Sequence, residues 1–211
     1  MRLINFKYNL FYITTNLINK NLIYFVMEIK GPTRREVEAK LVTQGDYVKI
    51  DYLTSCLKKC LDFDTKKFIL NKLSILYGER KMFLEAAKMI FAAADINPTY
   101  DSKIKDYTKA IELYIKAGRF DEAENCYIKA QSFAGEIQKV NMRITKKEFY
   151  KKEARELMQK DKRKHAMVAY EKLATLDLTP EEKKEVQTAL LDLYQKLGKV
   201  REFLILKKAV N

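Results

Sequence analysis

Apolar residues recur at helical spacing in the middle of the chain, and one short interruption divides them into two runs. In residues 105–130 the apolar positions on one helical face are Tyr107, Ala110, Ile111 and Tyr114, followed by Phe120, Ala123, Tyr127 and Ala130. Gly118 and Arg119 stand between the two runs, where a turn is expected. The small residues allow two helix backbones to approach closely. The pattern therefore predicts a hairpin of two packed helices.

A single hairpin of this size buries too little apolar surface to be stable alone, so copies are expected to stack on one another. Related patterns occur 37 residues earlier, 43 residues later and a further 37 residues later. Their marker residues are Tyr77, Phe83, Ala86, Ile90 and Ala93, then Leu157, Ala166, Tyr170 and Leu173, then Tyr194, Gly198 and Val200. A fainter copy 36 residues before the earliest of these has Leu41, Gly45 and Leu57. Five hairpins are therefore expected between about residues 31 and 210.

The central copy resembles the signature of the tetratricopeptide repeat (TPR) family, in the residues Gly118, Phe120, Ala123, Tyr127 and Ala130. The resemblance covers most of residues 31–211. It implies an all-α fold, a right-handed superhelical solenoid of about five TPR-like helix hairpins. The periods of 36 to 43 residues exceed the usual TPR length of about 34. They are also similar to the longer hairpins of soluble NSF-attachment-type proteins.

Capping signals mark where several helices are expected to begin. The pairs that fit a capping box are Thr33 with Glu36, Thr145 with Glu148, and Thr179 with Glu182. Pro180 then falls at the first position of a helix, where a backbone N–H would have no partner within the helix, so proline is tolerated there. Asp101 or Ser102 is expected to cap the helix that follows Pro98. Residues 131–142, the longest connection, are interpreted as an extension of the preceding helix.

Composition agrees with a helical protein, because 47% of the 211 residues of the chain are hydrophobic. Only three prolines and six glycines occur, and Gly45, Gly118 and Gly198 fall at expected hairpin turns. The three cysteines are too few and odd in number for a secreted disulfide framework, so a cytoplasmic location is expected. We divide the chain into an atypical N-terminal segment, residues 1–26, and a TPR-like helical repeat domain, residues 27–211.

The segment 1–26 has no acidic residue, no Ala and no Gly. A signal or membrane-spanning segment is one interpretation. However, asparagines such as Asn9 and Asn16 break every long apolar run, whereas a span needs about 20 mostly apolar residues. No membrane span is therefore expected. The alternative is that Met27 is the true start of the protein and that residues 1–26 are not part of the native chain.

Residues for catalysis or for holding a cofactor or metal are not apparent. His165 is the only histidine, and neither a Ser-His-Asp triad nor a multi-histidine metal site is expected. Cys56 and Cys60 are expected to share a helical face, where buried packing is the favoured role. Glycine-rich phosphate loops and nucleophile-elbow motifs are absent from the sequence. The protein is therefore interpreted as not being an enzyme and as needing no cofactor.

In TPR-like arrays the first helix of each hairpin lines the concave groove, which points to a polar stripe as the partner-binding surface. Its members are Arg35, Asn71, Thr108, Glu112, Lys147, Lys151, Arg155 and Thr188, with Asp192 continuing the stripe. Lys147, Lys151 and Arg155 lie at i, i+4 and i+8 and make its most basic part. The stripe does not reproduce the two-carboxylate clamp by which some TPR proteins hold acidic C-terminal peptides.

The net charge of +13 leaves two functions open. Residues 139–172 hold twelve basic and five acidic side chains, a local excess of +7, which is typical either of a solvated helix pair or of an anion-binding patch. The favoured function is a non-enzymatic module that binds another protein, as a peptide or helix, in its groove. The alternative is an RNA-binding helical repeat, because residues 116–123 are also similar to pentatricopeptide repeats. The oligomeric state stays open.

Overall fold

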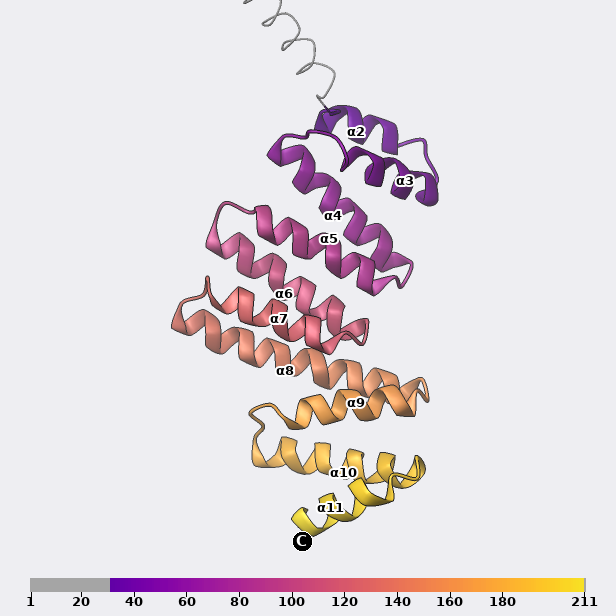
Figure 1. The fold of residues 1–211 in the computed structure, drawn as a ribbon, viewed down its shortest axis with the longest axis vertical. Coiled ribbons are helices and arrows are strands. Elements are labelled where there is room, and N and C mark those ends of the chain that lie inside the picture. The colour runs from indigo at the N-terminus through magenta and orange to yellow at the C-terminus, as the bar shows by residue number, and fades with distance from the viewer. Residues whose placement is uncertain (1–30, 211) are drawn as a thin grey trace, which may run out of the picture. The chain divides into compact units, whose positions relative to one another are not determined.

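The structure is a computed structural model that describes residues 31–210 (Figure 1). The part it describes consists of ten helices and contains no strand, which confirms the all-α prediction. None of these helices is long and apolar enough to cross a membrane. The predictions for residues 1–26 lie outside the described residues.

The chain divides within helix α4 (Phe63–Glu79) into two compact units, one ending at Leu73 and the other starting at Ser74. The first unit contains α2 (Arg34–Leu41) and α3 (Asp46–Cys56) besides the beginning of α4. Its buried side chains are mainly aliphatic and include Val37, Leu53 and Ile69.

The first helix of this unit begins as its sequence predicts. The backbone N–H of Thr33 donates to Glu36 Oε2 at 2.7 Å, and the N–H of Glu36 donates to Thr33 Oγ1 at 3.4 Å, which forms the expected capping box. The cysteine prediction is wrong in one respect. Helix α3 ends at Cys56, so Cys60 lies outside it and is exposed, and only Cys56 is buried.

The second unit continues from the end of α4 through seven further helices. They are α5 (Phe83–Ile96), α6 (Tyr100–Lys116), α7 (Phe120–Gln131), α8 (Glu136–Gln159), α9 (Arg163–Ala174), α10 (Pro180–Lys196) and α11 (Val200–Val210). Consecutive helices pack together along most of the unit, and α6 also packs against α8. Figure 1 shows them following one another in a row from α5 to α11. The small residues that the pattern singled out, such as Ala86, Ala123 and Ala166, are fully buried.

The same turn ends four helices of the second unit. Lys81, Gly118, Asp161 and Gly198 each have positive φ, between 53° and 69°, and they lie 37, 43 and 37 residues apart. After each of them the next N–H donates to a carbonyl five residues back, as Arg119 does to Tyr114 at 2.9 Å and Lys162 to Leu157 at 2.9 Å. This is the Schellman arrangement. The periodicity in the sequence is therefore also a periodicity of backbone geometry.

Three expected helix boundaries differ from the observed ones. Thr145 lies inside α8 rather than at its start, because the helix begins nine residues earlier, after Gly135. Thr99 caps α6, with its hydroxyl accepting from the N–H of Ser102, in place of Asp101 or Ser102. Most of residues 131–142 belong to the following helix, α8, and not to α7. The capping box of Thr179 with Glu182 and the position of Pro180 at the start of α10 are as predicted.

The 43-residue spacing between the turns at Gly118 and Asp161 corresponds to one longer helix. Helix α8 has 24 residues, whereas α6 and α10 have 17 each. Lys147 is the twelfth residue of α8, and it contacts Glu182, the third residue of α10. Residues 136–146, which we call the α8 extension, therefore run past the start of α10.

Candidate functional site

Three ion pairs join α8 to α10 and include the most basic part of the predicted stripe. Lys147 and Lys151 both donate to the carboxylate of Glu182, at 2.7 Å and 3.0 Å. One turn further along, Arg155 donates to Glu185 at 2.7 Å. The structure thus brings these three predicted residues together, and each has an acidic partner on the neighbouring helix.

The Glu182 carboxylate is strongly stabilised in its charged form. The hydrogen bond from Lys147, the backbone N–H of Thr179 and the hydrogen bond from Lys151 lower its pKa to about 2. The hydrogen bond to Glu182 in turn raises the pKa of Lys151. Lys147 and Glu182 keep only 17% and 16% of their side-chain surface exposed, so this pair is screened by solvent less than a fully exposed one.

The other predicted stripe residues are not gathered into the same cluster. The hydroxyls of Thr108 and Thr188 donate to carbonyls of their own helices, and Glu112 pairs with Lys116 at 2.7 Å. Arg35 is exposed and Asn71 half-buried, and both belong to the first unit.

Acidic partners in the folded protein neutralise much of the basic excess that the sequence shows in residues 139–172. Eight of its twelve basic side chains form ion pairs. Six of these eight have a partner outside this stretch: Lys139 with Glu136, Lys146 with Glu124, Lys147 and Lys151 with Glu182, Arg155 with Glu185, and Lys172 with Asp121. The pairs within the stretch are Lys151 with Glu148, Lys160 with Glu156, and Arg163 with Asp161. Within residues 31–210, Arg143, Lys152, Lys162 and Lys164 have no ion-pair partner. The surface is therefore less suited to binding a polyanion than its composition indicates.

Lys146 has a structural role that its sequence context conceals. Only 5% of the residue is exposed, and its ammonium lies 2.8 Å from a Glu124 carboxylate oxygen. The same ammonium lies over the ring of Tyr127, 3.6 Å from the centroid. A buried charge is tolerated when it is paired in this way. Lys146 therefore links α7 to α8 and is not available to a partner.

A cleft of about 360 Å³ lies beside the α8 extension. Its lining combines Val140, Arg143, Ile144, Lys146 and Lys147 of α8 with Tyr127 of α7 and with Thr175, Leu176 and Asp177, which connect α9 to α10. The lining is thus partly apolar, and it carries three basic side chains and one acidic side chain. Arg143 is exposed and forms no ion pair within residues 31–210.

Apolar side chains are exposed along the same part of α8. Ile137, Val140 and Ile144 expose 80%, 49% and 52% of their surface. They occur at i, i+3 and i+7, so they share one helical face. This exposed row was not predicted from the sequence. The signal in the sequence that could have indicated it is the 43-residue period. This period adds residues to α8, but no neighbouring helix gains apolar positions that would cover them.

The described residues contain no group of three or more His, Cys, Asp or Glu side chains that could hold a metal ion. What the arrangement offers is a surface: a cleft, an exposed apolar row on a helix, and an unpaired arginine. Neither a protein-family model nor a curated protein matches this chain.

Proposed function

We propose that the protein is a non-enzymatic interaction module that binds a segment of another protein, and that the α8 extension and its cleft form the binding surface. The observation that carries the proposal is the exposed row of Ile137, Val140 and Ile144 beside that cleft. Exposed apolar residues that lie in line on one helix are typical of a surface that a partner covers. The partner segment has apolar residues for this row and a carboxylate for Arg143.

The proposed architecture is a right-handed solenoid of about five TPR-like helix hairpins. Its support is the recurrence of one turn geometry at Lys81, Gly118, Asp161 and Gly198, together with the packing of α6 against α8. In this architecture α6, α8 and α10 are the first helices of successive hairpins. We place its activity in the cytoplasm, where thiols such as those of Cys56 and Cys126 stay reduced.

RNA binding is the second candidate, and the ion pairs argue against it. An RNA-binding surface needs basic side chains that are free to contact phosphates. Lys147, Lys151 and Arg155 are instead held by Glu182 and Glu185. Single-stranded generic RNA is therefore expected to bind with a dissociation constant no tighter than roughly 10⁻⁴ M, the weak end of non-specific affinity.

Affinity capture from cells that express the protein naturally, with and without nuclease, separates the two functions. Under this proposal discrete protein partners survive nuclease treatment and are lost with Ile144→Asp. A matched control is Ile128→Asp on α7, because Ile128 is exposed to a similar extent, 59%, but does not line the cleft. Loss of every partner on nuclease treatment would favour the RNA-binding function instead.

A further inference from the structure

A second cavity, of about 560 Å³, is lined by the turn between α6 and α7 and by the turn between α8 and α9. We call it the turn pocket. Its walls are largely apolar and include Ile115, Phe120, Leu157 and Val168. The proposed function makes no use of it, because it shares no lining residue with the cleft at the α8 extension.

One carboxylate in the turn pocket is buried without a partner. Glu153 lines the pocket and exposes only 7% of its surface. Among residues 31–210 no side chain or backbone group forms a hydrogen bond or an ion pair with it. Burial, followed by repulsion from Glu156, raises the pKa of Glu153. A buried acid in this state is costly, and its cost is relieved by any cation that enters the pocket.

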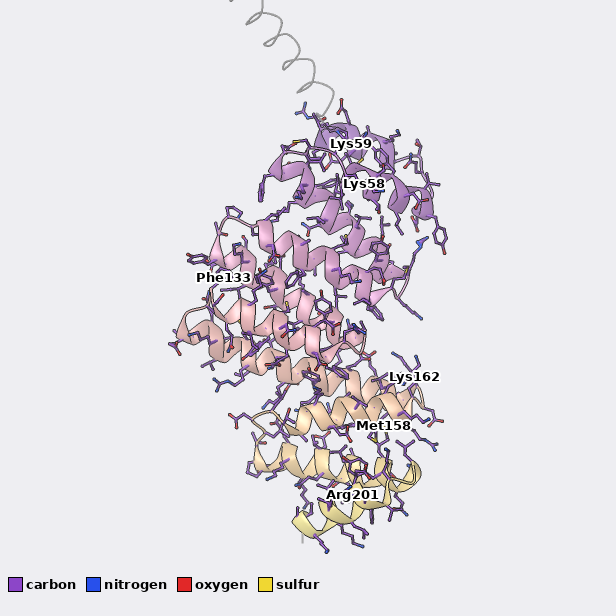
Figure 2. The ribbon with its side chains drawn as sticks, viewed as in Figure 1. Lys58, Lys59, Phe133, Met158, Lys162 and Arg201 are labelled. Atoms are coloured by element: carbon purple, nitrogen blue, oxygen red, sulfur yellow. The ribbon has the colours of Figure 1, made fainter. Side chains whose placement is uncertain are left out.

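The lysines around the turn pocket do not fill that role. Lys116 is held by Glu112 at 2.7 Å and Lys160 by Glu156 at 3.0 Å. Lys162 and Lys164 belong to the pocket lining but are exposed, and Figure 2 labels Lys162 near the turn between α8 and α9. Lys116, Lys160 and Lys162 lower the pKa of Glu153 through space, without forming an ion pair with it.

The pocket therefore presents a negative group inside and positive groups at its margin. His165, the only histidine of the chain, is exposed and also belongs to this margin. A ligand that matches this distribution has a cation on an apolar stem, with any anionic group placed outward. A free inorganic anion matches only the margin, and a purely apolar ligand leaves Glu153 unpaired.

We propose that the turn pocket is a binding site for an ammonium or guanidinium group carried on an apolar stem, with Glu153 as its counter-ion. The stem lies against Phe120, Leu157 and Val168, and an outward anionic group of the same ligand meets Lys162 or Lys164. The site is independent of the proposed protein-binding surface, so either one can fail without the other.

The test compares three probes that differ only in their polar end: 4-phenylbutylamine, 4-phenylbutanol and 4-phenylbutyrate. Binding to the full chain at pH 7 is followed by two-dimensional NMR titration. We expect the amine to shift resonances of residues around Glu153 and to bind at least about tenfold more tightly than the alcohol, because a charge-assisted contact is about twice as strong as a neutral one. The carboxylate is expected to bind most weakly.

Matched variants assign the effect to the buried acid. Glu153→Gln keeps the shape of the side chain and is expected to reduce affinity for the amine about tenfold while leaving the alcohol unchanged. The control is Glu148→Gln, which removes an exposed carboxylate on the same helix. Equal binding of amine and alcohol, retained amine affinity in Glu153→Gln, or no binding of the amine would each overturn the proposal.

Discussion

The ammonium of Lys147 on α8 lies 2.7 Å from a carboxylate oxygen of Glu182 on α10. The two residues are 35 positions apart in the sequence. Glu182 also completes the capping box of Thr179, so one carboxylate both begins α10 and fixes α10 against α8. The pair therefore connects two helices that are separated along the chain by α9.

The first prediction concerns the pH dependence of this contact. Because the pKa of Glu182 is lowered to about 2 in the folded state, its ion pairs stabilise the fold fully above its ordinary value of 4.5. That stabilisation is lost as the pH falls from 4.5 towards 2. Glu182→Gln is therefore expected to lower the melting temperature at pH 7, with a difference that narrows below pH 4.5. Thermal unfolding monitored by circular dichroism over this range measures it.

Glu181→Gln is the control for that experiment. Glu181 is the adjacent acid in the first turn of α10, is exposed, and forms no ion pair within the described residues. It is expected to change the melting temperature much less. Equal effects of the two substitutions would show that the helix dipole, and not the pairing with α8, is responsible.

The second prediction concerns the left-handed turn residues. Lys81 has a φ of 59°, which costs a residue with a Cβ atom more than it costs glycine. Lys81→Gly is therefore expected to stabilise the protein by about 0.5–1 kcal/mol, after the larger flexibility of glycine in the unfolded chain is included. Urea unfolding measures the change.

The reverse substitution at the equivalent turn is the companion test. A Cβ atom on Gly118 would meet nothing within 4 Å, so Gly118→Ala changes the backbone preference without creating a clash. We expect it to destabilise by about 1 kcal/mol. If both substitutions proved neutral, the four turns would not be under the conformational constraint that their φ angles indicate.

The third prediction concerns close packing at Ala123, which is fully buried in α7. Ala123→Leu forces additional methylene groups into the contact with α6 and is expected to cost about 1–3 kcal/mol. Ala174→Leu at the exposed end of α9 is the control and is expected to be nearly neutral. Chemical unfolding of both variants checks the difference, and an unchanged stability of Ala123→Leu would contradict the observed packing.

The fourth prediction concerns Glu153. Its pKa is raised in the folded state, mainly by burial, so folding is favoured while the acid is protonated and becomes less favourable as the pH rises above 4.5. Glu153→Gln removes this dependence. The variant is expected to be more stable than the wild type at pH 7 and equally stable below pH 4.5. A variant that is less stable at pH 7 would mean that the Glu153 carboxylate is neutralised by a group in the folded protein.

The helices of the second unit could be predicted from sequence because their signals are local. Apolar spacing places Tyr107 and Tyr127 in the core, and both are buried. Turn residues such as Gly118 mark helix ends through backbone preference alone. The start of α8 could not be predicted in this way, because Thr145 and Glu148 fit the capping-box pattern although they lie in the middle of the helix. Only packing decides between such alternatives.

The electrostatics of the candidate site could not be predicted in the same way. Ion pairs such as Lys146 with Glu124 and Arg155 with Glu185 join residues on different helices. A count of charges along the chain therefore does not distinguish a solvated lysine from one that is buried and paired, such as Lys146. The same limit applies to Glu153, which lies among basic residues in the sequence but has none as a partner.

Site-specific photocrosslinking tests the central claim, that the α8 extension is the surface where a protein partner binds. The photoreactive residue p-benzoylphenylalanine replaces Ile144 in one variant and Ile128 in the other, in cells that express the protein naturally. These two isoleucines are similarly exposed, at 52% and 59%, but only Ile144 lines the cleft. We predict a discrete, nuclease-resistant crosslinked protein with the photoreactive group at position 144 and not at 128. Crosslinks only to RNA at position 144, or equal crosslinking at both positions, would contradict the claim.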